Sequence, residues 1–151
     1  MRAFVLTITI LLLQEVKSSA QFGNPFEGGL NAVSKTATKA NLFLSHETAE
    51  LGSTIMAGIE MTMDDGWHTY WRNPGAAGIP TSVKWNLPKG VIAGDILWPV
   101  PEKFLSLGST GYGYKNTTML LVPLSIEKDA PLGKVELTGK VSWLECKTQC
   151  N

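Results

Sequence analysis

Apolar and polar side chains alternate along much of this chain, a pattern typical of β-strands that bury one face. In the stretch 54–63 the apolar face carries Ile55, Ala57, Ile59, Met61 and Met63. The stretch 135–143 repeats the pattern, with Val135, Leu137, Gly139, Val141 and Trp143 on one side. Both stretches are therefore expected to be strands with one face toward a core.

Other runs extend this picture. Residues 67–72 also alternate, with Trp67, Thr69 and Trp71 opposite to His68, Tyr70 and Arg72. Short strands are expected at 83–87 and 96–98. Residues 117–124 are more continuously apolar, which predicts a strand buried on both faces.

Turn-forming residues separate these runs. Clusters of Gly, Pro, Asp and Asn lie at 64–66, 73–75, 88–90, 129–131 and Gly133. We expect residues 75–78 to extend the turn at 73–75. No long stretch after residue 20 has helical periodicity. About seven short strands between such turns predict an all-β fold, an immunoglobulin-like antiparallel β-sandwich.

The N-terminal residues are typical of a secretory signal peptide. Arg2 precedes an apolar run at 3–13, which is shorter than the roughly 20 residues that span a bilayer. Small residues at 18–20 predict cleavage after Ala20. We therefore expect a signal peptide at 1–20, a loosely structured leader at 21–37 and one β-sandwich domain at 38–151.

Charge and motifs exclude several function classes. The chain has 13 basic and 13 acidic residues, so it lacks the basic footprint of a nucleic-acid-binding protein. It contains no G-x-S-x-G nucleophile elbow and no phosphate-binding loop ending in GK[ST].

The two cysteines, Cys146 and Cys150, carry the strongest chemical signal. In an exported protein a pair this close could form a disulfide, hold a metal or exchange electrons. A disulfide requires the chain to turn between them, because an extended strand would separate their Cα atoms by about 13 Å. A loop of about five residues adds only about 2 kcal/mol of stability, which mildly favours a redox role.

Metal binding is less well supported. A structural zinc site needs four ligands, and neither His46 nor His68 has a partner at ligand spacing. Met61 and Met63 could join Cys146 and Cys150 on a soft ion such as Cu(I). We expect both histidines to be surface or strand-face residues, and nothing in the spacing places one beside a cysteine.

Neighbouring residues could tune the pair. Lys147 would favour the thiolate of Cys146, and Glu145 would oppose it. The chain also has five tryptophans, which are expected to fill a core or to form an aromatic rim around a site. Trp143 fits the core by its parity, yet it lies only three residues before Cys146.

Several ordered motifs resemble the N-terminal periplasmic domain of the thiol:disulfide interchange protein DsbD and its ScsB-like relatives. They are Gly66–Gly75, Gly78–Pro80, Trp85–Gly90, Trp98–Pro101, Gly111–Tyr114 and Val141–Leu144, followed by Cys146 and Cys150. The resemblance covers roughly residues 38–150. It implies a periplasmic immunoglobulin-like domain whose redox-active positions are Cys146 and Cys150.

The resemblance also implies a function. The Cys146–Cys150 disulfide would exchange with dithiols through mixed disulfides, without a bound cofactor. Electrons would pass from a membrane-embedded partner domain to periplasmic thioredoxin-like or disulfide isomerase proteins, as part of a protein-disulfide reductase system. The candidates for the surround of this site are Trp143, Trp67, His68, Tyr70 and Trp71. ScsB-like relatives are associated with copper tolerance, which keeps the Cu(I) alternative open, as does a non-catalytic binding module with a structural disulfide.

The chain departs from the family pattern at two places. Ala76 stands where an acidic residue is expected after Asn-Pro-Gly. The family also continues past the second cysteine with further β-structure, whereas this sequence stops at Asn151. We therefore expect either a fragment of a longer protein or a truncated domain, with an unpaired edge near Val135–Trp143.

Overall fold

The structure is a computed structural model that describes residues 8–14, 36–106 and 108–147. None of these residues lies in a helix. In this part of the chain there is accordingly no helix long and apolar enough to cross a membrane. The predicted cleavage site after Ala20 and most of the predicted leader lie outside the described residues.

Eleven strands form three sheets among the described residues. The first sheet contains β1 (Ile8–Gln14), β10 (Val135–Ser142) and β5 (Ser82–Asn86) in that order. The second contains β2 (Thr38–Leu44), β3 (Thr54–Met63), β9 (Thr117–Ile126) and β6 (Val91–Ala93). The third contains β11 (Glu145–Cys146), β4 (His68–Gly75), β8 (Ser109–Lys115) and β7 (Glu102–Ser106).

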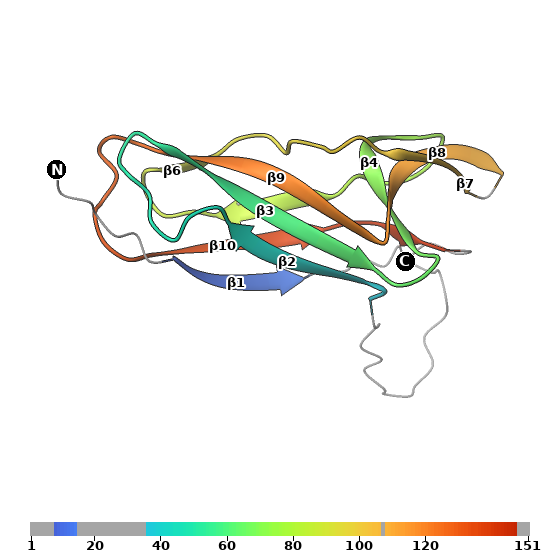
Figure 1. The fold of residues 1–151 in the computed structure, drawn as a ribbon, viewed down its shortest axis with the longest axis horizontal. Coiled ribbons are helices and arrows are strands. Elements are labelled where there is room, and N and C mark those ends of the chain that lie inside the picture. The colour runs from blue at the N-terminus through green and yellow to red at the C-terminus, as the bar shows by residue number, and fades with distance from the viewer. Residues whose placement is uncertain (1–7, 15–35, 107, 148–151) are drawn as a thin grey trace, which may run out of the picture.

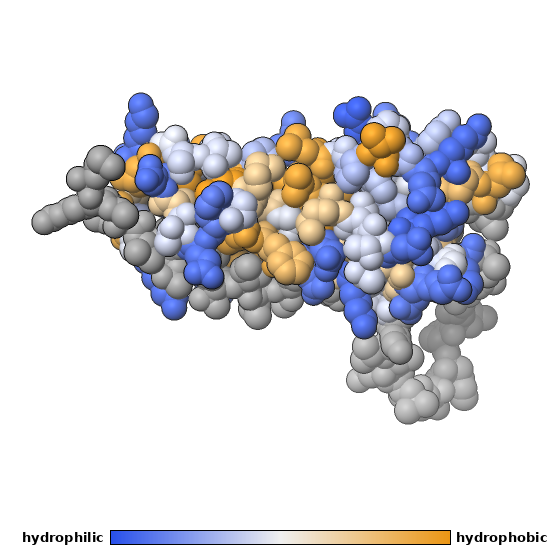
Figure 2. All heavy atoms as spheres, in the orientation of Figure 1, coloured by the Kyte–Doolittle hydropathy of each residue, from blue (hydrophilic) through white to orange (hydrophobic). Residues whose placement is uncertain are grey.

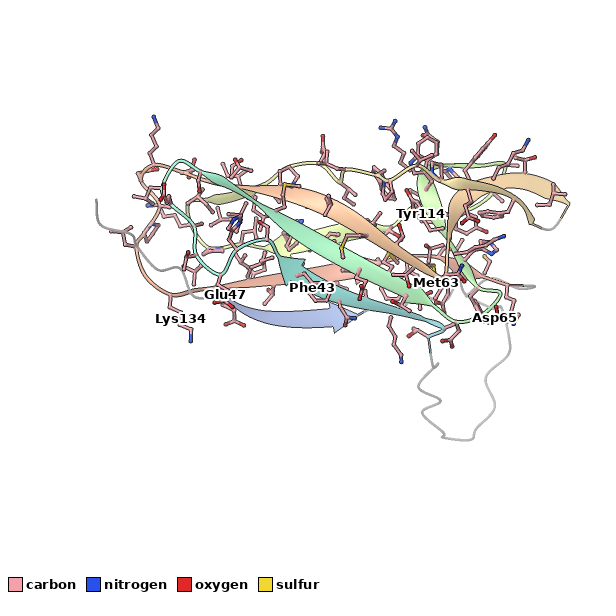
Figure 3. All side chains as sticks on the ribbon, in the orientation of Figure 1. Phe43, Glu47, Met63, Asp65, Tyr114 and Lys134 are labelled. Carbon is pink, nitrogen blue, oxygen red and sulfur yellow. The ribbon has the colours of Figure 1, made fainter. Side chains whose placement is uncertain are left out.

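The first two sheets lie one behind the other along the length of the molecule, and β4, β7 and β8 gather at one end (Figure 1). The main core lies between the layers and includes the apolar faces of β3, β9 and β10. Met63 and Tyr114 lie between the strands toward the end that carries β4 (Figure 3). The predicted all-β immunoglobulin-like sandwich is confirmed, with β1 and β10 as a parallel pair in an otherwise antiparallel structure.

The two clearest alternating stretches form strands as predicted. β3 has the predicted bounds, and its five apolar positions from Ile55 to Met63 are buried. In β10, Leu137 and Val141 are buried, and Trp143 just beyond the strand is buried too. The predicted strand at 83–87 is β5, shifted by one residue.

The prediction that residues 117–124 are buried on both faces was wrong. Along β9 the buried positions alternate with exposed ones, so Leu120 is fully buried while Met119 and Leu121 are 36% and 39% exposed. Figure 2 shows apolar side chains gathered along the middle of the face that carries β3 and β9. The continuous apolar run therefore comes from a strand whose outer face is also apolar.

Two other predicted elements differ from the structure. Residues 96–98 form only an isolated bridge, between Leu97 and Leu121. Asn73–Gly75 is part of β4, because Gly75 pairs with Gly111 after a break in register that follows Tyr70. This irregularity has the character of a β-bulge, and Gly75 accommodates it with a φ of 97°.

The edge of β10 near Val135 is covered in the structure. β1 pairs in parallel with β10 from Ile8 opposite Val135 to Gln14 opposite Val141. The prediction of an unpaired edge at Val135–Trp143 therefore does not hold for the full chain. β1 falls inside the predicted signal peptide, which stays a prediction.

Candidate functional site

Cys146 lies on β11, a strand of two residues that is added to the edge of β4. In this antiparallel pair Cys146 is opposite His68, and Glu145 is opposite Thr69. Cys146 is 1% exposed and is disulfide-bonded. Cys150 lies outside the described residues, so the Cys146–Cys150 pairing stays a prediction.

Three aromatic rings surround Cys146, and we call His68, Tyr70 and Phe104 the ring cluster. The centroids of His68 and Phe104 are 4.4 Å apart, those of His68 and Tyr70 are 5.3 Å apart, and those of Tyr70 and Phe104 are 6.1 Å apart. Tyr70, Phe104 and Cys146 form a small core of their own, against which Leu144 packs. The cysteine sulfur is therefore shielded by aromatic side chains from β4 and β7.

Two polar contacts connect His68 to Tyr70 and Tyr70 to the sulfur of Cys146. The Tyr70 hydroxyl donates a hydrogen bond to Cys146 Sγ over 3.2 Å. His68 Nε2 lies 3.3 Å from the same hydroxyl oxygen. His68 and Tyr70 are two residues apart on β4, so their side chains share the face that meets Cys146.

Of the two expectations for His68, the strand-face one agrees with its place on β4 opposite Cys146, and the surface one does not. Its side chain is 5% exposed and lies beside Cys146. Burial lowers the pKa of His68 below its ordinary value of 6.5, and the positive charge of Lys115 lowers this pKa further. His68 is therefore neutral at pH 7. His46, in contrast, is exposed and hydrogen-bonds to Ser45 Oγ.

The charged neighbours of Cys146 are directed away from it. Glu145 is 1% exposed, and its Oε1 and Oε2 accept hydrogen bonds from the Ala37 N–H and from Trp143 Nε1. Because successive residues of a strand face opposite sides, this carboxylate is separated from the Cys146 sulfur by the backbone. Lys147 Nζ donates to the carbonyl oxygen of Asp65 on the turn after β3, which Figure 3 labels.

Glycines allow the ring cluster to be covered closely. Gly78 lies against the Tyr70 ring, and a Cβ at this position would overlap the ring. Its φ of 126° also disfavours any other residue. On β8, a Cβ at Gly111 would lie 2.8 Å from the Phe104 ring. The segment after β4, predicted only as a turn, therefore covers Tyr70.

The structure brings together only some of the predicted surround. His68 and Tyr70 contact each other and lie at Cys146. Trp143, Trp67 and Trp71 pack against or within the main core instead. Trp143 reaches the site indirectly, through its hydrogen bond to Glu145.

The methionines of the copper alternative also lie in the main core. Met61 Sδ accepts a hydrogen bond from Thr81, and Met63 Sδ accepts one from Thr69. Cys146 belongs to the separate small core. Within the described residues no group of three or more His, Cys, Asp or Glu side chains is placed to hold a metal ion.

Sequence reasoning missed Phe104 as a member of the site, and it assigned Glu145 a role that the structure does not support. Phe104 is the middle residue of β7, a five-residue strand, and its only signal is one aromatic residue in a short run without clear alternation. The signal for Glu145 was its parity, which it shares with Trp143, the residue that was expected to fit the core.

Comparisons with known proteins find a family and a solved structure with a similar fold. A family model described as the N-terminal domain of the thiol:disulfide interchange protein DsbD matches residues 40–151. The crystal structure of the N-terminal periplasmic domain of ScsB from Proteus mirabilis has a similar fold, with a TM-score of 0.59 and 22% sequence identity. The similarity covers 81% of this chain and 45% of that one. A comparison with curated protein sequences finds no match. Because the family model matches most of its length, this chain belongs to the family of the DsbD N-terminal domain.

Proposed function

We propose that this domain is a periplasmic thiol–disulfide exchange module that uses the Cys146–Cys150 pair. It takes electrons from a membrane-embedded partner domain and passes them to periplasmic thioredoxin-like proteins. Family membership supports the interchange chemistry. The observation that carries the proposal is the environment of Cys146, a disulfide-bonded cysteine whose sulfur accepts a hydrogen bond from Tyr70 inside an aromatic cluster.

The burial of Cys146 supports a division of roles within the pair. At 1% exposure its sulfur is out of reach of a thiol on another protein. Exchange with partners therefore takes place at Cys150, and Cys146 is the internal sulfur. This assignment also agrees with the hydrogen bond from Tyr70, which stabilises negative charge on Cys146.

The exchange proceeds in two balanced steps. A thiolate of the electron donor attacks the sulfur of Cys150, a donor–Cys150 disulfide forms, and the Cys146–Cys150 bond breaks with its electron pair on Cys146. A second donor thiolate then attacks the donor sulfur of the mixed disulfide and releases Cys150. The donor leaves oxidised and the domain is reduced by two electrons. The same steps in reverse reduce the thioredoxin-like acceptor.

A redox titration of the purified protein against glutathione or dithiothreitol tests the proposal. We expect a reduction potential above about −300 mV, within reach of cellular dithiols. A pair that stays oxidised well below this value would behave as a structural bond. In that case the domain would be a non-catalytic immunoglobulin-like binding module, and the exchange function would be rejected.

Single serine variants test the division of roles. Cys146→Ser should trap a mixed disulfide between Cys150 and a thioredoxin-like protein, because no internal thiol remains to resolve it. Cys150→Ser should trap none, because the remaining sulfur is buried. The matched comparison is the yield of mixed disulfide from the two variants on non-reducing gels. Equal yields would contradict the assignment of Cys150 as the exchanging cysteine.

Copper binding is tested separately. Competition with bicinchoninate measures whether the reduced protein retains Cu(I). We expect none to be retained, because Met61 and Met63 lie in the main core, apart from the small core that contains Cys146. Stoichiometric retention that is lost in the double Cys→Ser variant would favour a copper module.

A further inference from the structure

His68 is connected to the sulfur of Cys146 through one intermediate, the Tyr70 hydroxyl. A tyrosine hydroxyl has a single proton, and here that proton is donated to Cys146 Sγ. The neighbouring Nε2 of His68, 3.3 Å away, must then supply the hydrogen of the second contact. The direction of both bonds follows from counting one proton on the hydroxyl.

We propose that His68 is a positioning residue for thiol–disulfide exchange, because its Nε2–H fixes the Tyr70 hydroxyl so that the hydroxyl proton points at Cys146 Sγ. This inference rests on the proposed function. It assigns a chemical role to a residue that otherwise would only fill the space between β4 and β7. Tyr70 contacts the reacting sulfur, whereas His68 acts through Tyr70.

The hydrogen bond from His68 to Tyr70 becomes important when the disulfide is reduced. Breaking the disulfide leaves a thiolate on Cys146, in a place where water cannot solvate it. The Tyr70 hydroxyl is the donor that the site provides for this charge. Without the bond from His68, the hydroxyl could rotate toward other acceptors, and the thiolate would lose part of its stabilisation.

The surroundings of His68 hold its ring in place. The Phe104 ring packs on it at 4.4 Å, and Lys115 is opposite it on β8. Lys115 Nζ lies over the Phe104 ring at 5.5 Å, so the positive charge is on this side of the site. Glu145, the carboxylate next to Cys146 in sequence, faces the other side and makes its own hydrogen bonds.

The test compares two substitutions at one position. His68→Phe keeps an aromatic ring for Phe104 but removes the N–H donor, and His68→Gln keeps an N–H donor near the place of Nε2. We expect His68→Phe to slow reduction of the protein by dithiothreitol several-fold, and Tyr70→Phe to slow it about tenfold. His68→Gln should restore most of the rate. Equal rates for His68→Phe and wild type would overturn the inference.

A second readout excludes a merely structural effect. In the Cys150→Ser background the ultraviolet absorbance of the thiolate reports Cys146 alone. His68→Phe should raise the pKa of the Cys146 thiol, and it should have no further effect once Tyr70→Phe is present. An effect of the same size in the presence and absence of the Tyr70 hydroxyl would contradict action through Tyr70. His46→Phe, at an exposed histidine, is the matched control and should leave the pKa unchanged.

A measurement on the unmodified protein does not depend on how the variants fold. Nitrogen chemical shifts of the His68 ring report which nitrogen carries the proton. We expect the Nε2–H form at neutral pH, and the Nδ1–H form would overturn the inference. If wild type has the Nε2–H form but fails the redox titration, the proposed function fails and the hydrogen-bond arrangement stands. If wild type passes and His68→Phe is indistinguishable from it, only the role of His68 fails.

Discussion

At the scale of single residues, Cys146 and Glu145 are neighbours with opposite surroundings. The sulfur of Cys146 contacts the ring cluster. The carboxylate of Glu145 instead binds two N–H donors on the other side of the strand. The carboxylate connects the backbone of Ala37 and the indole of Trp143 to the strand that carries the cysteine. Glu145 therefore fixes the position of Cys146 without touching its sulfur.

Glu145→Ala should lower the free energy of unfolding by about 1–3 kcal/mol, because it leaves the Ala37 N–H and the Trp143 indole N–H without their acceptor. Glu145→Gln should lower the free energy of unfolding by less, because its one amide oxygen still accepts a hydrogen bond from one of the two donors. Urea unfolding measures both changes. Glu136→Gln, on the exposed side of β10, is the control and should have little effect. A loss for Glu145→Gln as large as that for Glu145→Ala would contradict this account.

His68 should make stability depend on pH. Because its folded-state pKa is lowered by burial and by Lys115, the unfolded chain takes up this proton at a higher pH than the folded chain. The stabilisation is complete above the ordinary pKa of 6.5 and is lost as the pH falls through 6.5 toward the folded-state value. Between about pH 7.5 and 5.5, wild type should lose more unfolding free energy than His68→Gln. His46→Gln should keep the wild-type dependence, and parallel curves for wild type and His68→Gln would refute the expectation.

At the scale of elements, β9 shows that an apolar side chain in a strand is not necessarily buried. Its neighbouring residues Leu120 and Leu121 have the same side chain, but one lies in the main core and the other on the outer face of the sheet. Period-two geometry gives this result whatever the residue types are. The two leucines therefore form a matched pair within one strand.

Leu120→Ala should lower the free energy of unfolding by about 2–5 kcal/mol, because it leaves a cavity in the main core. Leu121→Ala removes the same atoms from a partly exposed position and should cost less than about 1 kcal/mol. Thermal or urea unfolding of the two variants checks the difference. Similar losses would indicate that the outer face of β9 is covered.

The sequence predicted the elements whose patterns are local. β3 and β10 have clean alternation and long runs, and both formed where the pattern placed them. β8 contains Gly111 and Gly113, which are poor strand formers, and only contact with Phe104 and the backbone at Thr69 explains them. The position of Asn73–Gly75 inside β4 depends on its partner strand, which a turn-like sequence cannot reveal.

The site was predictable only in part, because its contacts join strands that are far apart in the sequence. The cysteines and Tyr70 were recognisable from motifs that resemble a known family. The contact between Cys146 and His68 depends on the register of β11 against β4, which a single residue of slippage would change. Phe104 packs with Cys146 and lies on a further strand, β7. No spacing along the chain encodes these contacts.

At the scale of the whole molecule, the proposed Cys146–Cys150 disulfide would contribute little to global stability. A bond that closes a loop of about five residues removes little entropy from the unfolded chain, worth about 2 kcal/mol. The three sheets and the main core hold the fold, so reduction should leave the domain folded. This independence would suit the proposed redox role of the pair.

Reduction with dithiothreitol should therefore lower the free energy of unfolding by about 2 kcal/mol without unfolding the protein. The double variant Cys146→Ser, Cys150→Ser should match the reduced protein within about 1 kcal/mol. Urea unfolding curves followed by tryptophan fluorescence measure all three forms. Loss of the folded state on reduction would show that the bond is structural.

The short separation of the two cysteines and the long separation of Cys146 from Tyr70 have a consequence for the order of folding. Cys146 and Cys150 are neighbours even in an unstructured chain, so they can be oxidised before any strand has paired. The Tyr70–Cys146 contact spans 76 residues and can form only after β4 and β11 have met. Oxidation can thus precede assembly of the site, and an early-formed bond would acquire its reactivity only when the sandwich closes around it.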